Sequence, residues 1–392
     1  MSRFTLPVGY HDFHRSKIVN YQLNRWHSLG YCRLEDLKAA AARIEGVDNF
    51  KNIMLQEGER ALAEDRYINA AFHIRGAEFF VPPHDPDKLN LYNRFIDLFY
   101  NKVVNADPVQ RVDVPYNSGA LPTLRLPSQK EECRGTILIH GGFDSFMEEF
   151  YSMAWYFAER GYDVIMFEGP GQGGALKHHR LYWNHEWEKP TSAVLDYYDC
   201  KNVTILGISM GAWLCVRAAA FESRIARVII MGVGYDFLAA VPTPLVALVR
   251  FLFKFPGFFD RISWLKARLS QQERWAIHNL LHISGKDSPA AASKLFLDMN
   301  ATNLHSERVT QDVLLLTGAE DHFGQFNMHL KLHRMQIEAL TGARSVADHI
   351  FTREEHAHNH CQVGNIGLAL DVIAAWLEDV SQNAITARTR GD

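Results

Sequence analysis

Strand-like runs, most of them continuously apolar, alternate with helical patterns over most of the chain beyond residue 110. These runs lie at residues 136–140, 163–167, 203–206, 227–231, 313–317 and 345–351. The segments between them carry apolar residues three or four positions apart, which is the spacing of an amphipathic helix. Short apolar strands that alternate with helices predict a mostly parallel sheet covered on both faces. The pattern therefore predicts an α/β fold.

The first hundred or so residues have a different pattern. Residues 34–44, 61–80 and 88–102 show helical periodicity, with a proline-rich break at residues 81–86. Two strand patterns follow, at residues 111–116 and 121–126, and Asn117-Ser118-Gly119 between them is a hairpin signal. We expect a helical N-terminal domain over residues 1–108 and the first part of an α/β core over residues 109–234.

An interruption rich in Phe, Leu, Trp and Pro follows the sixth predicted strand. It covers residues 235–304, and we interpret it as a helical cap inserted into the core, which resumes over residues 305–392. A few additional surface helices are the alternative. Chains with open α/β sheets bind ligands at the carboxyl ends of the strands, so a cap at this position would lie above the site.

Composition narrows the classes of partner. The chain has 392 residues, of which 47% are apolar, so a large core is available. A formal charge of −4, with no basic run, gives no reason to expect nucleic acid. No apolar stretch reaches the roughly 18 residues that span a bilayer, and we expect no membrane partner. A homodimer is left open.

The N-terminus and the cysteines favour a cytoplasmic protein. Residues 1–10 lack the apolar core and cleavage signal of a secretory leader. The five cysteines are odd in number, and no two of them form a C-x-x-C pair. Reduced thiols fit this pattern best, and a zinc site built on cysteine is not expected.

The pentapeptide Gly207-Ile208-Ser209-Met210-Gly211 fits G-x-S-x-G. The pentapeptide alone is common, but here a predicted strand comes directly before it and a predicted helix directly after it. That context is the one that a nucleophile elbow requires. The sequence therefore predicts Ser209 as a nucleophile, raised above the carboxyl ends of the strands.

A serine hydroxyl needs a base, and the base needs an orienting group. In this class the acid follows the nucleophile in the chain and the histidine comes last. Asp321 lies just after the predicted strand at residues 313–317 and is the expected acid, with Glu320 as its competitor. After the last strand, His356 and His360 are both candidates for the base. The alternate histidines there could also suggest a metal site, but no second ligand cluster accompanies them, and we expect no metal.

The oxyanion hole needs two backbone N–H donors. One is expected from Met210, the residue after the nucleophile, and the other from the loop after the strand at residues 136–140. That loop contains Gly142 and Phe143 in a His-Gly-Gly-Phe-Asp sequence. Glycine lets the backbone turn its N–H groups toward a substrate oxygen.

These motifs resemble those of α/β-hydrolases with a helical N-terminal domain. That group includes the 2,6-dihydroxypseudooxynicotine hydrolases, the fermentation–respiration switch esterase-like proteins and the Ayg-type polyketide hydrolases. The matching stretches are residues 140–146, 167–173, 207–211 and 359–365. In these relatives the closing motif is Glu-Glu-Gly-Ala, two variable residues and His-Cys-Gln. The resemblance implies His360 as the base and leaves His356 in the glycine position.

The resulting hypothesis is a serine hydrolase that needs no cofactor and acts on a small molecule. The resemblance implies attack at a carbonyl, of an ester or of a ketone whose carbon–carbon bond is cleaved, through an acyl-enzyme. Residues expected to contact a mid-sized, partly apolar substrate are Trp213, Tyr235, Asp236 and Glu148. The alternatives are an acyltransferase, a haloperoxidase-like use of the same residues, and a non-catalytic binding protein.

Overall fold

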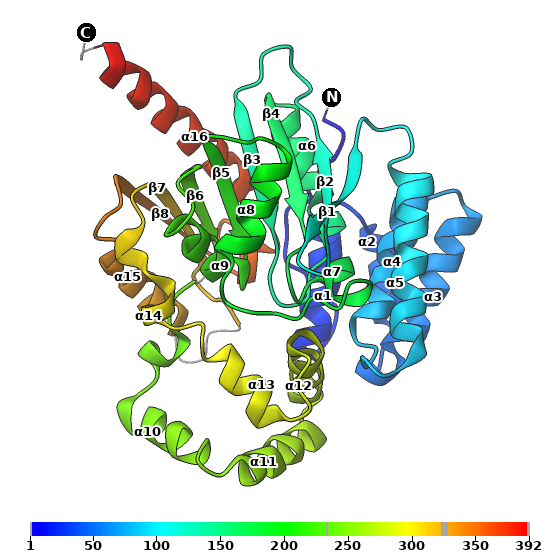
Figure 1. Cartoon of the computed structure of the whole chain (residues 1–392). Coiled ribbons are helices and arrows are strands. Elements are labelled where there is room, and N and C mark those ends of the chain that lie inside the picture. The colour runs from blue at the N-terminus through cyan, green and yellow to red at the C-terminus, as the bar shows by residue number, and fades with distance from the viewer. Residues whose placement is uncertain (1, 233, 323–327, 390–392) are drawn as a thin grey trace.

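The computed structural model describes residues 2–232, 234–322 and 328–389. Its centre is an eight-stranded sheet with the strand order β1-β2-β4-β3-β5-β6-β7-β8. The pairs β1–β2 and β2–β4 are antiparallel, and all other neighbours are parallel. The strands are β1 (Gln110–Tyr116), β2 (Gly119–Leu126), β3 (Gly135–His140), β4 (Tyr162–Phe167), β5 (Val203–Ile208), β6 (Ile225–Met231), β7 (Asp312–Gly318) and β8 (Ser345–Phe351). This sheet confirms the predicted α/β fold (Figure 1).

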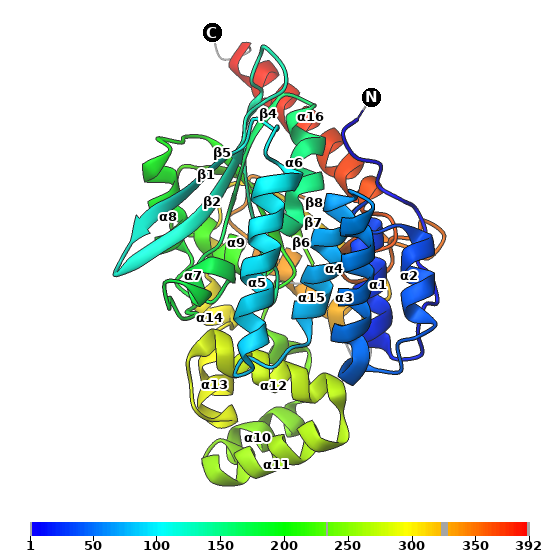
Figure 2. The same ribbon diagram turned by 90° about the vertical axis from the view of Figure 1, so that its right-hand side faces the viewer.

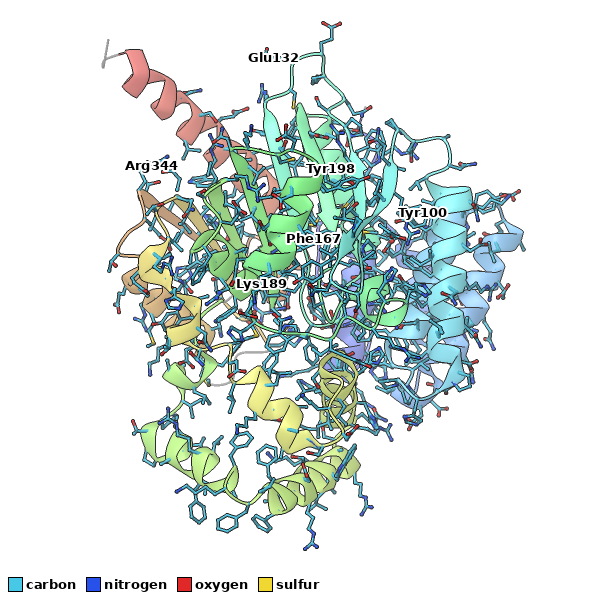
Figure 3. The ribbon with its side chains drawn as sticks, viewed as in Figure 1. Tyr100, Glu132, Phe167, Lys189, Tyr198 and Arg344 are labelled. Carbon is cyan, nitrogen blue, oxygen red and sulfur yellow. The ribbon has the colours of Figure 1, made fainter. Side chains whose placement is uncertain are left out.

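Burial explains why the central strands could be recognised in the sequence. Every residue of β5 and β7 is buried, as the continuous apolar runs require. Phe167 at the end of β4, labelled in Figure 3, is only 1% exposed. The β1–β2 hairpin pairs Tyr116 with Gly119 across a two-residue turn, and Asn117 there has a φ of 50°. Asparagine tolerates this left-handed conformation better than most residues.

The chain before the sheet is helical. Its elements are α1 (Lys17–Ser28), α2 (Leu34–Ala41), α3 (Val47–Ala63), α4 (Tyr67–Phe79), α5 (Pro86–Leu98) and η1 (Phe99–Val103). The helical stretch expected over residues 61–80 is divided between α3 and α4, because Asp65 takes a left-handed φ of 54°. Figure 2 shows these helices side by side on one flank of the sheet.

Helices also cover the sheet and extend beyond one end of it. Those around the sheet are η2 (Met147–Phe150), α6 (Tyr151–Ala158), α7 (Gly173–Lys177), α8 (Glu188–Tyr197), α9 (Gly211–Ala219), α15 (Met328–Ala339), η6 (His360–Gln362) and α16 (Ile366–Thr389). Between β6 and β7 the chain forms η3 (Phe237–Ala240), α10 (Thr243–Leu252), α11 (Pro256–Leu269), α12 (Gln271–Ser284), α13 (Pro289–Phe296), α14 (Ala301–Leu304) and η4 (Ser306–Arg308). Helices α10 to α13 gather beyond the sheet at one end of the molecule (Figures 1 and 2). Within the described ranges, no helix is long and apolar enough to cross a bilayer.

Buried charges join the N-terminal helices to the sheet. Glu149 of η2, whose side chain is fully buried, forms ion pairs with Arg25 of α1 and with Arg75 of α4. Arg75 also pairs with Glu78, and the Oε1 of Glu78 lies 3.0 Å from the Nζ of Lys88 of α5. Since a buried charge is tolerated only when it is paired and hydrogen-bonded, this network fixes where the helices meet the core.

Replacing Glu149 by Ala should destabilise the protein by about 3–5 kcal/mol, because Arg25 and Arg75 would lose a buried partner. Urea denaturation followed by circular dichroism would measure the loss. The control is Glu378→Ala at the exposed Arg134–Glu378 pair, which should change the free energy of unfolding by less than about 1 kcal/mol. Equal effects of the two substitutions would contradict a structural role for the buried network.

Candidate active site

Ser209 occupies a strained turn between β5 and α9. Its φ is 62°, in the left-handed region that non-glycine residues adopt only at a cost. The turn is tight enough that a Cβ on Gly207 would lie 2.0 Å from the Gly211 carbonyl oxygen. A Cβ on Gly211 would lie 2.6 Å from the carbonyl oxygen of Gly141. Both glycines of the motif are therefore required for the close approach of backbone to backbone.

Two hydrogen bonds connect Ser209, His360 and Asp321. The Nε2 of His360 lies 2.8 Å from the Oγ of Ser209, and its Nδ1 lies 2.6 Å from Oδ2 of Asp321. Asp321 comes from the loop after β7 and is 5% exposed, and His360 begins η6. With the proton on Nδ1 directed at Asp321, Nε2 can accept the serine proton.

Asp321 also controls the charge state of His360. Burial lowers the pKa of the imidazole, but the negative charge of Asp321, its hydrogen bond to the ring and the neighbouring Cys361 together raise it by more, so the pKa stands well above its usual 6.5. The same carboxylate would stabilise the imidazolium that forms when the ring accepts a proton. The neighbouring His322 differs, because burial lowers its pKa to about 4.

The two competing residues lie elsewhere. Glu320 pairs with Arg353 on the surface, with one contact of 2.9 Å. His356 is exposed and has a φ of 58°. That left-handed conformation explains why the relatives implied by the resemblance have glycine at this position.

The loop after β3 lies against the residue that follows Ser209. A Cβ on Gly142 would lie 2.6 Å from the backbone nitrogen of Met210. The N–H of Gly142 donates to Oγ of Ser145 at 3.1 Å. Within the part of the chain that the structure describes, the N–H groups of Phe143 and Met210 have no hydrogen-bond acceptor. Their role as oxyanion-hole donors stays a prediction.

The four residues expected to contact substrate have different environments. Trp213 is fully buried in α9, and Tyr235 is partly exposed. Asp236 accepts the Leu238 N–H at 2.9 Å and so caps η3. Glu148 is 1% exposed and accepts the hydroxyl of Tyr100, labelled in Figure 3, at 2.8 Å. Both carboxylates thus have partners within the fold, and contact of any of the four residues with substrate stays a prediction.

Sequence reasoning missed the side chains that support the site. Gln172 donates to the carbonyl oxygens of Gly141 and Gly142 at 2.8 and 3.2 Å. Its Gly-Pro-Gly-Gln-Gly-Gly segment was the only local signal, since such a loop is typical of a turn beside a site. Tyr21 of α1 donates to the carbonyl oxygen of His360 at 3.3 Å, and nothing near it in the sequence indicates this. In the described ranges, no group of three or more His, Cys, Asp or Glu side chains is arranged to hold a metal ion.

Comparisons with known proteins show what the chain is similar to. A family model described as "alpha/beta hydrolase fold" matches residues 137–277. Hydrolase acrC of Aspergillus aculeatus is 29% identical over 73% of this chain and 74% of its own. The 20-hydroxy-prefusarin hydrolase FUS2 of Gibberella moniliformis is 27% identical, with 82% of each chain covered.

Solved structures show the same fold. The 2,6-dihydroxy-pseudo-oxynicotine hydrolase superposes with a TM-score of 0.65 at 20% identity, over 91% of this chain and 95% of that one. The protein AbyA5 superposes with a TM-score of 0.63 at 15% identity, over 88% and 90%. The chain therefore has the α/β-hydrolase fold and is an enzyme, a hydrolase, that resembles the fungal hydrolases and the 2,6-dihydroxy-pseudo-oxynicotine hydrolase.

Proposed function

We propose that the chain is a serine hydrolase in which Ser209 is the nucleophile, His360 the general base and Asp321 the orienting acid. The observation that carries this proposal is the pair of short contacts that His360 makes, 2.8 Å to Ser209 and 2.6 Å to Asp321. A hydroxyl, an imidazole and a carboxylate in this order are the arrangement that activates a serine. The strained turn at Ser209 supports the same assignment.

The reaction has two stages. As the Oγ of Ser209 forms a bond to the substrate carbonyl carbon, its proton passes to Nε2 of His360, and the carbonyl electron pair moves onto oxygen. The N–H groups of Met210 and Phe143 stabilise that oxyanion. When the oxyanion collapses, the leaving group takes the proton from His360 and an acyl-enzyme remains. Water, deprotonated by His360, then attacks the acyl carbon. The bond to Ser209 breaks as His360 returns the proton to its Oγ, which releases the acid and restores the serine.

The substrate class follows from the walls near the loop after β3. Phe143 packs edge-to-face on Trp275 of α12 and on Phe296 of α13, with ring centroids 5.9 and 6.0 Å apart. Rings at this position favour a mid-sized, partly apolar carbonyl compound. Helices α12 and α13 both belong to the segment between β6 and β7, and we assign the helices of that segment as a cap over the site.

An ester is the favoured bond. Carbon–carbon cleavage also begins with attack on a carbonyl, but the departing carbanion must be protonated or stabilised as it leaves. The two acids that the sequence offers for this step are Asp236 and Glu148, and each is bonded within the fold. An alkoxide leaving group needs only the proton that His360 already holds.

A fluorophosphonate probe should label the wild-type protein at Ser209 and should not label Ser209→Ala. Removal of the nucleophile should reduce kcat by about 10⁶-fold. His360→Ala should be as damaging, whereas His356→Ala should retain most activity because that side chain is exposed and the Ser209 hydroxyl is held by His360. Labelling of a folded Ser209→Ala variant would contradict Ser209 as the nucleophile. A larger loss of activity in His356→Ala than in His360→Ala would contradict His360 as the base.

The acid limb of the kcat/KM profile should lie above pH 6.5. His360 accepts a proton only when it is neutral, and its raised pKa keeps it protonated to a higher pH than usual. Asp321→Asn removes the charge that raises this pKa while burial still lowers it, so the limb should move to lower pH. The turnover at the optimum should also fall, on the order of 10⁴-fold. If the acid limb stays at the same pH in Asp321→Asn, Asp321 does not raise the pKa of His360.

A substrate panel would test the bond. Activated esters with acyl chains of increasing size should be hydrolysed by the wild type, and β-diketones of matched size should be cleaved slowly or not at all. Liquid chromatography with mass spectrometry of the products, with and without added alcohol, also distinguishes hydrolysis from acyl transfer. Diketone cleavage at a kcat/KM equal to that of the best ester would overturn the preference for an ester.

A further inference from the structure

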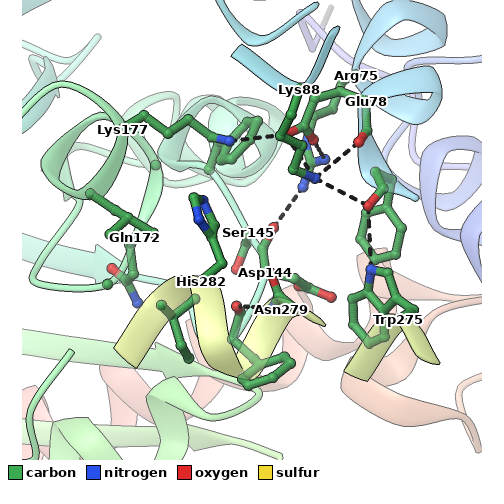
Figure 4. Close-up of a pocket in the computed structure, with 17 residues that line it drawn as sticks. Arg75, Glu78, Lys88, Asp144, Ser145, Gln172, Lys177, Trp275, Asn279 and His282 are labelled. Carbon is green, nitrogen blue, oxygen red and sulfur yellow. Dashed lines mark hydrogen bonds and ion pairs between the residues drawn. The ribbon is translucent and has the colours of Figure 1, made fainter. Parts of the chain in front are cut away.

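Side chains from three separate regions hold four successive carbonyl groups of the loop after β3. Gln172 binds the carbonyl oxygens of Gly141 and Gly142. Asn279 of α12 donates to the Phe143 carbonyl oxygen at 2.9 Å, and Arg75 of α4 donates to that of Asp144 at 2.6 Å. Figure 4 shows Gln172, Asn279 and Arg75 around this part of the loop.

These contacts determine which way the N–H groups point. In a trans peptide the C=O of one residue and the N–H of the next point in opposite directions, and the described residues contain no cis peptide. Holding the Gly142 carbonyl at Gln172 therefore directs the Phe143 N–H to the other side. The carbonyl of Phe143 itself is held at Asn279, so both peptide groups that flank Phe143 are fixed.

Asn279 is itself placed by the packing of α12 on α4. Trp275, one turn earlier, stacks on Phe79 with ring centroids 5.1 Å apart and planes 16° apart. The indole N–H of Trp275 donates to the Phe79 carbonyl oxygen at 3.3 Å. Contact between an N-terminal helix and an inserted helix thus sets the position of the amide that reaches the loop.

Arg75 is fixed more tightly still. Its side chain is 1% exposed, and it pairs with Glu149 at 2.7 Å and with Glu78. Its guanidinium also lies 3.9 Å from the ring centroid of Phe146. The hydrogen bond to the Asp144 carbonyl oxygen is therefore donated by a group with little freedom to move.

The cavity enclosed by these side chains is small. Its volume is about 30 Å³, enough for one or two water-sized groups. The polar side chains around it lie close to the loop, and their hydrogen bonds bear on its shape.

We propose that Asn279 and Arg75 are positioning residues, which hold the loop so that the Phe143 N–H faces the developing oxyanion. This inference rests on the proposed function, since it assumes attack by Ser209. It makes the oxyanion hole depend on α4 and α12 as well as on the sheet. Neither residue touches the substrate carbonyl, and both act through the backbone of residues 143 and 144.

The decisive variant is Asn279→Leu, which keeps a similar volume and removes the donor. We expect kcat on an activated ester to fall about 10–100-fold with KM nearly unchanged, less than or comparable to the loss of an oxyanion-hole donor itself. Affinity for a trifluoromethyl ketone, which adds to the serine as a tetrahedral anion, should fall by the same factor. The matched control is Gln272→Leu, an exposed amide on the same helix, which should match the wild type in both measurements.

Arg75→Lys is the second variant. A lysine keeps the positive charge beside Glu149 and Glu78, but its single ammonium cannot replace the planar guanidinium that reaches three acceptors. We expect losses of kcat and of trifluoromethyl ketone affinity like those of Asn279→Leu. Thermal unfolding shows whether each variant folds. If Arg75→Lys does not fold, the test rests on Asn279→Leu, because the side chain of Asn279 is only half-buried.

The inference fails if folded Asn279→Leu keeps kcat and inhibitor affinity within twofold of the wild type. It also fails if kcat falls while the affinity for the trifluoromethyl ketone does not, or if only KM changes. Failure of the proposed function has a different signature, because the wild type itself would then resist the fluorophosphonate probe.

Discussion

A peptide group can present its N–H to a substrate only if its carbonyl oxygen finds a partner on the opposite side. This constraint explains much of the architecture around Ser209. The carbonyl oxygens of Gly141 and Gly142 share one donor, the amide of Gln172, and the next two carbonyls have donors from helices outside the sheet. A buried carbonyl without a donor would cost roughly 1–3 kcal/mol. Without these donors the peptide groups of the loop would turn toward other partners, and their N–H groups would no longer face the site.

The catalytic side chains depend on a simpler arrangement. Each follows the carboxyl end of a parallel strand, where the chain leaves the sheet: Ser209 after β5, Asp321 after β7, and His360 beyond β8. Strand pairing places these ends along one edge, which brings residues far apart in sequence within hydrogen-bond distance. Asp321, with a contribution from Cys361, then outweighs the effect of burial on the pKa of His360. The sheet thus sets the position of the imidazole, and its neighbours set its proton affinity.

The sequence was informative wherever a feature is local. The continuous apolar run of β5 and the glycines beside Ser209 lie within a few positions of each other. Strand order suggests Asp321 and leaves His356 and His360 as candidates for the base, and the family resemblance implies His360. The supporting contacts are not local. Arg75 lies 69 positions from Asp144, and Asn279 lies 136 positions from Phe143. No sequence pattern indicates that an arginine of one helix and an asparagine of another bind the same loop. Only the packing of α4 and α12 reveals these two contacts.

The buried charges can be understood as a series of requirements that begins at the loop. A donor that reaches the Asp144 carbonyl through the core must be long and polar, as Arg75 is. The buried charge of Arg75 must then be paired, and Glu149 and Glu78 pair with it. Two buried carboxylates beside one arginine require further cations. Arg25 supplies one to Glu149, and Lys88 and Lys177 supply two to Glu78. Burial still lowers the pKa of Lys88 to about 8, although the charge of Glu78 raises it. Apolar side chains can often replace a buried ionic network without loss of stability, but they have no N–H to donate to the Asp144 carbonyl as Arg75 does.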